Sequence, residues 1–222
     1  MAGARLADLV MPQPLTLYFA PSACSLSAHI VLRELGAPFE LVQVDLRNKT
    51  LVDPAREAAQ RWLEINPKGY VPALRLPDGT IITEAQVILG YLADTHPDAH
   101  LAPPHGTLAR VQLDMIVSFI ATELHKGLAP FFHPAFGGDY KAQVQQRLAQ
   151  RFIELATRLR GGPYLGGERF SIADAYAFYV LRTWQKVAQG ELATVPELPA
   201  YYQRLAERLS VAKALEVEGI TA

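Results

Sequence analysis

The stretch Ala20-Pro21-Ser22-Ala23-Cys24-Ser25-Leu26-Ser27 decides the fold of the first part of this chain. It separates an alternating apolar run over residues 15–19 from a run over residues 28–35 whose apolar residues have helical spacing. The pattern predicts a strand, a loop that carries the only cysteine, and then a helix. Backbone N–H groups and the positive dipole end at a helix start both favour a thiolate at Cys24. A small buried residue is the alternative interpretation of a lone cysteine.

The position three residues after Cys24 limits its redox chemistry. Ser27 stands where a dithiol motif would have its second cysteine. Any disulfide chemistry at Cys24 therefore requires an external thiol.

Size and composition narrow the class of protein. The chain has 222 residues, of which 50% are hydrophobic and 19% charged, with a formal net charge of −1. It contains no cluster of five basic residues and no apolar run near the roughly 18 residues of a membrane span, so neither nucleic acid nor a membrane is expected as a partner. One cysteine fits a reducing compartment, and we expect a cytoplasmic protein. Residues 1–13 are predicted to be an extension, and either Met1 or Met11 is compatible with the natural start.

Residues 14–95 are predicted to form an α/β, thioredoxin-like domain. Gly36 ends the first helix, and the run over residues 40–45 predicts a second strand, parallel to the first in a βαβ unit. Residues 46–61 are polar and irregular, with a short helix expected among them and Lys49 in a loop.

The second part of this domain is predicted to be a hairpin and a helix. Val71-Pro72 opens a strand and is a candidate cis peptide. Pro77-Asp78-Gly79 predicts a turn that joins two antiparallel strands. Thr83-Glu84-Ala85 then begins a helix.

Residues 96–106 are predicted to be a linker, and residues 107–222 an all-α helical bundle. One long helix is expected over residues 108–127, and a single apolar stripe follows residues 144–159. Ser171-Ile172-Ala173-Asp174 matches a capping box that begins a buried helix, interpreted as a stability element. Leu198, Tyr202, Leu205 and Leu209 predict one last amphipathic helix.

The polar stripe of the long helix ends in a basic pair. Ser118, Thr122 and His125 are spaced by four and three residues, so they are predicted to share one face, and Lys126 adjoins them. Without other context, His125 and Lys126 would simply complement the dipole at a helix C-terminus.

Three motifs in this order resemble the glutathione transferases. They are Ser-Ala-Cys-Ser-Leu-Ser at residues 22–27, Asn-Pro-Lys-Gly-Tyr-Val-Pro-Ala-Leu at residues 66–74, and Thr-Glu-Ala at residues 83–85. Cys24 together with His125-Lys126 resembles the bacterial beta class in particular. The resemblance runs from Leu15 onward and implies a thioredoxin-like domain followed by a helical domain that holds the second substrate.

The resemblance also implies a role for individual residues toward glutathione. Val71, before Pro72, would offer its backbone to the cysteinyl unit. Glu84 would pair with the γ-glutamyl ammonium, and the N–H groups of Glu84 and Ala85 would hold the γ-glutamyl carboxylate. Lys49 and Lys126 would each contact a carboxylate of glutathione, and His125 would lie near the sulfur. Ser118 and Thr122 would face the cleft. Trp184 and Phe131-Phe132 would line the electrophile pocket.

The implied function is conjugation of the glutathione thiolate to small hydrophobic electrophiles, a detoxifying activity of a bacterial homodimer with no cofactor and no metal. Cys24, Ser25 and His125 are the candidate donors to the thiolate, and a mixed disulfide at Cys24 is a further possibility. A glutathione-dependent isomerase is one alternative, although Leu26-Ser27-Ala28-His29 lacks the arginine that the zeta class usually carries there. A non-catalytic carrier of glutathione or hydrophobic ligands is the other.

Overall fold

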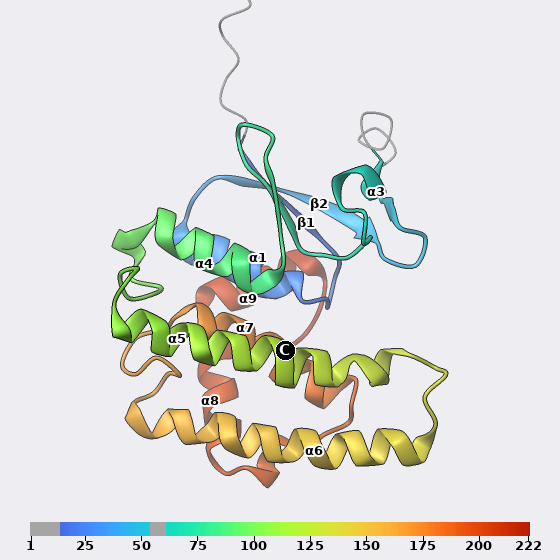
Figure 1. Cartoon of the computed structure of the whole chain (residues 1–222), viewed down its shortest axis with the longest axis vertical. Helices are drawn as coiled ribbons and strands as arrows, with labels where there is room; N and C mark the ends of the chain where they lie inside the picture. Colours follow the sequence, from blue (N-terminus) through green and yellow to red (C-terminus); the bar gives the residue numbers. More distant parts are fainter. Residues whose placement is uncertain (1–13, 54–60) are drawn as a thin grey trace, which may run out of the picture.

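The computed structural model describes residues 14–53 and 61–222, so the predicted extension at residues 1–13 lies outside the described residues. In the first half, a mixed sheet alternates with helices (Figure 1). Its elements are β1 (Leu15–Phe19), α1 (Ser25–Leu35), β2 (Phe39–Asp45), β3 (Thr50–Leu51), α3 (Trp62–Ile65), β4 (Ala73–Arg75), β5 (Ile81–Thr83) and α4 (Ala85–Thr95).

The strand order in the sheet is β3-β2-β1-β4-β5. β1 pairs with β2 in parallel and with β4 antiparallel, and β4 and β5 form the antiparallel hairpin. These pairings confirm the predicted βαβ unit and hairpin. β3 was not expected, because its two residues carry too short a pattern to predict a strand. The short helix expected within residues 46–61 falls partly outside the described residues; α3 begins just after them.

β1 is buried on both faces because it lies in the middle of the sheet. Leu17 and Leu74 belong to a core that continues through α1 and α4 into the helical half. Tyr18, Val42 and Trp62 belong to a smaller core on the other face of the sheet. The large core is continuous between the two halves, so the division at residues 96–106 stays a prediction.

The second half is helical throughout the described residues. Its main helices are α5 (Leu108–Phe119), α6 (Gly138–Thr157), α7 (Ile172–Lys186), α8 (Glu197–Ala206) and α9 (Leu209–Glu218), and its 3-10 turns include η2 (Pro97–Ala99), η5 (Arg158–Gly161) and η6 (Leu192–Thr194). In Figure 1, α1 and α4 lie between the sheet and the pair α5 and α6. α1 packs against α4, α7 and α9, which places the start of α1 next to the helical half.

The long helix expected over residues 108–127 is not uniform. After α5 the chain forms a π-helical turn, η3 (Ile120–His125), and then a 3-10 segment, η4 (Lys126–Phe132). The Lys126 N–H donates to the Ala121 carbonyl, five residues back, as a π-helix requires. The prediction of one regular helix was wrong because an inserted wide turn leaves no mark in an apolar pattern.

The single last helix predicted from Leu198 to Leu209 is also wrong. The chain breaks at Arg208, which has an extended ψ of 136°, and Leu209 begins α9 with its side chain exposed. Arg208 donates two hydrogen bonds to Glu34 at the end of α1, at 2.8 and 2.9 Å. This ion pair stabilises the extended conformation of Arg208 between α8 and α9. Among the described residues no helix is both long and apolar enough to cross a membrane.

Candidate functional site

Cys24 is the N-cap residue of α1 and is half-buried. Its thiol donates a hydrogen bond to the Val71 carbonyl, with Sγ and O separated by 3.1 Å. Val71 and Pro72 are joined by a cis peptide bond, as the sequence suggested, and both are buried. The structure therefore brings together the cysteine and the backbone group that the resemblance assigned to glutathione binding.

The start of α1 lowers the pKa of the Cys24 thiol, as the sequence predicts, but it does not produce a thiolate in this state. Burial raises the pKa of the thiol to about 12 and outweighs the other effects on it. The backbone N–H groups of Cys24 and Ser25 and the charge of Lys126 lower the pKa, while Glu84 raises it. Cys24 is therefore a neutral S–H group at neutral pH and is a hydrogen-bond donor in this state.

Ser25 does not direct its hydroxyl to the Cys24 sulfur. The side chain is fully buried, donates to the Ala20 carbonyl at 3.3 Å and accepts from the Ala20 N–H at 3.2 Å. Both bonds close the loop between β1 and α1. The candidate role of the Ser25 hydroxyl as a donor to a substrate is thus replaced by a role in shaping this loop.

The C-terminal part of the chain holds the same loop. Ser22 has a positive φ of 65°, and its N–H donates to Glu218 Oε2 at 3.2 Å. Glu218 Oε1 lies 3.0 Å from Nδ1 of His29, and both side chains are buried. Arg182 of α7 donates to the Ser22 hydroxyl at 3.2 Å. No local pattern in the sequence predicts these contacts, because their partners are up to 196 residues apart.

Glu84 precedes α4 with a φ of 68°, a strained value for a residue with a side chain. Its carboxylate accepts a hydrogen bond from Lys68, whose Nζ lies 2.7 Å from Oε1, and this bond lowers the pKa of Glu84. Lys68 lies within the motif at residues 66–74, but nothing in the sequence pattern alone predicts a role for its side chain. Ala85 is the buried first residue of α4, where N–H groups lack intrahelical partners.

The turn that carries Lys68 also positions Lys49. The Asn66 side chain donates to the Tyr70 carbonyl at 2.6 Å, and the Gly69 N–H donates to the Asn66 carbonyl at 2.8 Å. Gly69 has a φ of 66°, and a Cβ there would lie 2.9 Å from Cδ of Lys49. The exposed Lys49 side chain therefore crosses this turn, which requires glycine.

His125 lies at the end of the π-helical turn, half-buried against α7. Its Nδ1 is 2.7 Å from the hydroxyl of Tyr176, and its ring meets the Tyr179 ring edge-on at a centroid distance of 5.1 Å. Burial, followed by the charge of Lys126, lowers the pKa of His125 to about 4. His125 is therefore neutral at physiological pH. Tyr176 and Tyr179 were missed because tyrosines on an apolar helix are indistinguishable from core residues.

The rest of the predicted polar stripe separates from His125. Ser118 and Thr122 are exposed, and the Thr122 hydroxyl donates to the Ser118 carbonyl at 2.9 Å. The wider π-helical turn changes the direction of the later residues, so the three side chains do not share one environment. The exposed Lys126 follows His125, and its charge acts on Cys24.

Trp184 does not join Cys24 and His125. Its side chain is 4% exposed, packs on Phe152 of α6 at a ring distance of 5.1 Å, and lies so close to Gly190 that a Cβ there would be 1.8 Å from it. These contacts place Trp184 in the core of the helical half, which corrects its predicted place in the electrophile pocket. Phe131 is half-buried and Phe132 exposed in η4.

The groups that converge are Cys24, Val71, Glu84, His125 and Lys126, and together they are called the Cys24 site below. The charges of Glu84 and Lys126 both act on Cys24, and those of Lys126 and His125 act on Glu84. The sheet half therefore supplies the thiol, the carbonyl and the carboxylate, and the helical half supplies the imidazole and the ammonium. Within the described residues no three His, Cys, Asp or Glu side chains are arranged to hold a metal ion.

The chain has a thioredoxin-like half, with a cysteine at the start of its first helix, and a helical half that adds a histidine and a lysine. These features define a class of thiol-binding proteins built from a thioredoxin-like half and a helical half. The family model for the glutathione S-transferase N-terminal domain matches residues 21–95, and that for the C-terminal domain matches residues 119–208. Glutathione S-transferase GstA of Escherichia coli O157:H7 is 42% identical over 204 residues, which cover 92% of this chain and 98% of GstA. This chain belongs to the glutathione S-transferase family.

A solved beta-class enzyme agrees with this assignment. The glutathione S-transferase of Sphingomonas chungbukensis, described as bacterial beta class, matches with a TM-score of 0.85 and 39% identity, over 93% of this chain and 100% of the other. A probable maleylacetoacetate isomerase of Caenorhabditis elegans is more distant, at 29% identity over 73% of this chain and 74% of its own length. The similarity to the beta class is thus confirmed.

Proposed function

We propose that this protein conjugates the thiolate of glutathione to small hydrophobic electrophiles. The observation that carries the proposal is the charge complementarity around Cys24. Glutathione in its thiolate form has three negative groups and one positive group. The chain offers three positive side chains, Lys49, Lys68 and Lys126, and one negative side chain, Glu84. Lys49 crosses the turn at Gly69 that carries Lys68, and Lys68 forms an ion pair with Glu84. The charge of Lys126 acts on Cys24. Backbone pairing at Val71 and the N-terminus of α4 would fix the peptide between these charges.

The thiolate itself would be stabilised by neutral donors. Burial alone raises a thiol pKa, so hydrogen bonds must supply the opposite effect. The Cys24 S–H, which donates to the Val71 carbonyl in this state, and the imidazole of His125 are the neutral side-chain donors of the Cys24 site. About 3 kcal/mol of stabilisation would bring a thiol pKa from about 8.5 to near 6.5, which two good donors to an anion can supply. Ala85 contributes no hydroxyl, so only its N–H is available for the γ-glutamyl carboxylate.

Thiol–disulfide exchange through Cys24 is less well supported. The Cys24 thiolate would attack a glutathionylated substrate, form a mixed disulfide and release the other sulfur as a thiolate. A pKa of about 12 leaves little of that thiolate at neutral pH. The alternative isomerase function is also less well supported. Arg33, the first arginine after Cys24, lies 4.9 Å over the Phe39 ring and donates to His29 at 3.3 Å, so it contacts other residues of its own half.

The protein would act as a cytoplasmic bacterial homodimer in detoxification, with glutathione as co-substrate and no cofactor. The bacterial relatives above support the bacterial part of this proposal. Exposed apolar side chains on α4 and α5 support the dimer: Val87, Leu108, Val111 and Met115 are all at least half exposed, at 50%, 74%, 50% and 57%. Leu108, Val111 and Met115 are spaced by three and four residues and so share one face of α5, and monomeric proteins seldom expose large apolar patches.

Two assays on wild type and Cys24→Ala test the proposal. One measures conjugation of glutathione to a chloronitrobenzene, and the other measures reduction of a small mixed disulfide. We expect wild type to conjugate, and Cys24→Ala to keep part of this activity because His125 remains. If wild type binds glutathione but shows neither activity, the carrier function is correct. If it does not bind glutathione, the proposal fails at the site.

A further inference from the structure

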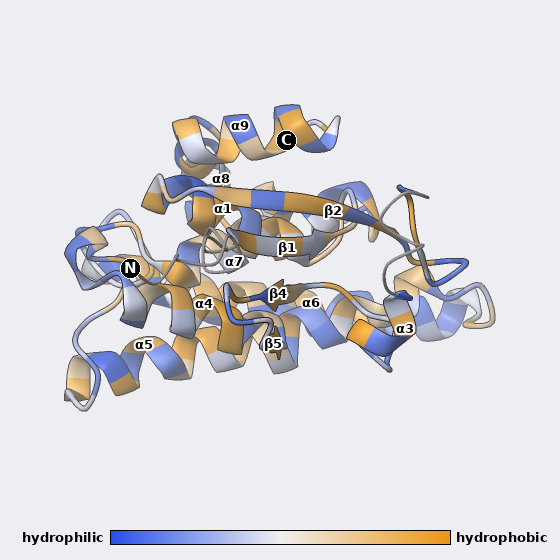
Figure 2. Cartoon of the chain, turned by 90° about the horizontal axis from the view of Figure 1, so that it is seen from above, coloured by the Kyte–Doolittle hydropathy of each residue, from blue (hydrophilic) through white to orange (hydrophobic). Residues whose placement is uncertain are grey.

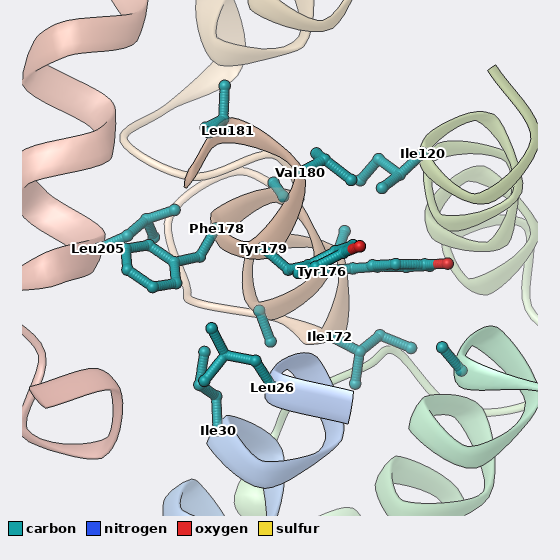
Figure 3. Close-up of a cluster of buried hydrophobic side chains, with 14 of the residues drawn as sticks. Leu26, Ile30, Ile120, Ile172, Tyr176, Phe178, Tyr179, Val180, Leu181 and Leu205 are labelled. Carbon is teal, nitrogen blue, oxygen red and sulfur yellow. The ribbon is translucent and has the colours of Figure 1, made fainter. Parts of the chain in front are cut away.

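Tyr176 is the one side chain that hydrogen-bonds His125 within the described part of the chain. The Tyr176 hydroxyl is 2.7 Å from Nδ1, and the two rings are at 72° to each other. Figure 3 shows Tyr176 and Tyr179 leaving α7 on the same side, toward Ile120, while Phe178 points the other way, toward Leu205. The rings of Tyr179 and His125 are at 85° to each other, and within the described residues no hydrogen bond joins the Tyr179 hydroxyl to the imidazole. The two tyrosines therefore form a natural pair of test and control.

The position of one proton follows from the chemistry of this contact. Burial raises the pKa of the Tyr176 phenol, so the hydroxyl keeps its proton at any physiological pH. Neutral His125 carries a single N–H. If Nδ1 held that hydrogen, the phenol would be the acceptor and its own proton would point to no partner recorded among the described residues. An unsatisfied buried donor is costly. If the phenol donates to Nδ1, the buried Tyr176 hydroxyl is satisfied, and the imidazole hydrogen lies on Nε2 of the half-buried His125, where solvent or glutathione accepts it.

We propose that Tyr176 fixes His125 as the tautomer protonated at Nε2, so that His125 acts as a hydrogen-bond donor to the glutathione thiolate and not as the base that removes the thiol proton. Tyr176 is then a positioning residue, which acts through His125. This inference rests on the proposed function. It also has a consequence for proton balance: Nδ1 is occupied by the phenol and Nε2 is already protonated. The glutathione S–H bond therefore breaks with its proton leaving to solvent, and the electron pair stays on sulfur.

The tautomer can be measured directly in the free protein. Nitrogen NMR of histidine-labelled protein distinguishes Nδ1–H from Nε2–H by the shifts and couplings of the ring nitrogens. We expect His125 in wild type to show Nε2–H as the single form between pH 6 and 8. A mixture, or Nδ1–H, would overturn the proposal whether or not the protein is active. Assignment uses His125→Gln, in which the His125 signal disappears.

The functional consequence is tested with Tyr176→Phe and its control Tyr179→Phe. The thiolate absorbance of bound glutathione against pH gives the pKa of the bound thiol. We expect Tyr176→Phe to raise that pKa by about one unit, because one oriented donor to an anion is lost. For a bound thiol with a pKa near 6.5, this lowers kcat/KM at pH 7 roughly tenfold, of which about threefold is in kcat and about threefold is in KM for glutathione. In Tyr179→Phe, the pKa of the bound thiol should stay near that of wild type, and kcat/KM should stay within about twofold of wild type. An unchanged pKa in folded Tyr176→Phe contradicts the proposal.

Substitution of His125 distinguishes a hydrogen-bond donor from a general base at this position. The amide N–H of glutamine can stand in for an Nε2–H donor, whereas asparagine reaches only to the Nδ1 position. We expect His125→Gln to retain several-fold more conjugating activity than His125→Asn, and glutathione binding to release about one proton to buffer at pH 7.5 in wild type. Uptake of that proton by the protein would show that His125 is the base. If wild type shows no thiolate signal at all, the proposed function fails, while the NMR result still decides the tautomer.

Discussion

The Nζ of Lys68 lies 2.7 Å from Oε1 of Glu84, and both side chains are more than half exposed, at 62% and 51%. The pair stands at the N-terminus of α4, where the α-amino and α-carboxyl groups of the γ-glutamyl unit would bind. A carboxylate next to an ammonium is the charge complement of such a zwitterion. Lys68 is therefore expected to face the incoming carboxylate while Glu84 faces the ammonium.

Replacing Lys68 by glutamine should raise KM for glutathione about three- to tenfold and leave kcat nearly unchanged, because an exposed ion pair contributes about 1 kcal/mol. Lys68→Arg should retain most of the affinity. Steady-state kinetics with varied glutathione measure both, and Lys213→Gln, an exposed lysine on α9, is the control. A lower KM in Lys68→Gln would show instead that Lys68 competes with the substrate ammonium for Glu84.

The raised pKa of Cys24 predicts that its thiol reacts slowly with alkylating agents. With a pKa of about 12, the thiolate fraction at pH 7 is on the order of 10³ times smaller than that of free cysteine. We expect alkylation by iodoacetamide to be at least about a hundredfold slower than in the urea-unfolded chain. Its rate should keep rising with pH up to pH 10, without a plateau.

Mass spectrometry follows this alkylation simply, because the chain has one cysteine. A plateau with a midpoint below pH 9 in the folded protein would contradict the assignment of Cys24 as a neutral donor.

Neutral His125 should make the protein less stable in acid. Its pKa is about 4 in the folded state and about 6.5 when unfolded, so the folded state binds fewer protons between these values. Stability should therefore fall as pH drops through 6.5 toward 4, by about 2 kcal/mol at pH 5 relative to pH 7.5.

Urea unfolding at both pH values, at one protein concentration, measures this loss. The difference between wild type and His125→Asn isolates the contribution of His125, because every other group is common to the two. Equal losses in the two proteins would refute it.

The apolar face on α4 and α5 predicts a dimer interface. In Figure 2, α5 lies on the opposite side of the molecule from α9. We expect Met115→Glu to convert the dimer to monomer, because burying an unpaired carboxylate in an apolar interface costs several kcal/mol. Val217→Glu, 49% exposed on α9, should remain dimeric. Light scattering after size exclusion decides between these results, and a monomeric wild type would refute the dimer.

The capping box of α7 predicts a large loss of stability on substitution. The buried Asp174 carboxylate accepts from the Ser171 N–H and hydroxyl at 2.8 and 2.7 Å, from the Leu165 N–H at 2.9 Å and from the Tyr201 hydroxyl at 2.7 Å. Asp174→Ala leaves these donors unsatisfied, so we expect a loss of about 3–5 kcal/mol. Asp139→Ala, an exposed first-turn acid of α6, should cost less than about 1 kcal/mol in the same urea titration.

Local signals in the sequence were enough for most of the fold. The alternation over residues 15–19, the turn at Pro77-Asp78-Gly79 and the stop at Gly36 each act within a few residues, and β1, the hairpin and α1 lie where they predict. The Ser171–Asp174 capping box is likewise local, and both of its hydrogen bonds are present. These features depend on backbone conformation and hydrophobic period, which a chain carries wherever its partners lie.

The tertiary structure alone decided the ionisation of the site and the partners of its residues. The helix start favours a thiolate at Cys24, but burial outweighs it, and burial is not a local property. The partnership of His125 with Tyr176 joins residues 51 positions apart, and it depends on a π-helical turn that the apolar pattern does not reveal. The sequence by itself pointed to Cys24, Val71, Glu84, His125 and Lys126 as candidates for the site. Long-range packing placed Trp184 elsewhere, brought Tyr176 to His125, and decided the protonation and orientation of the groups.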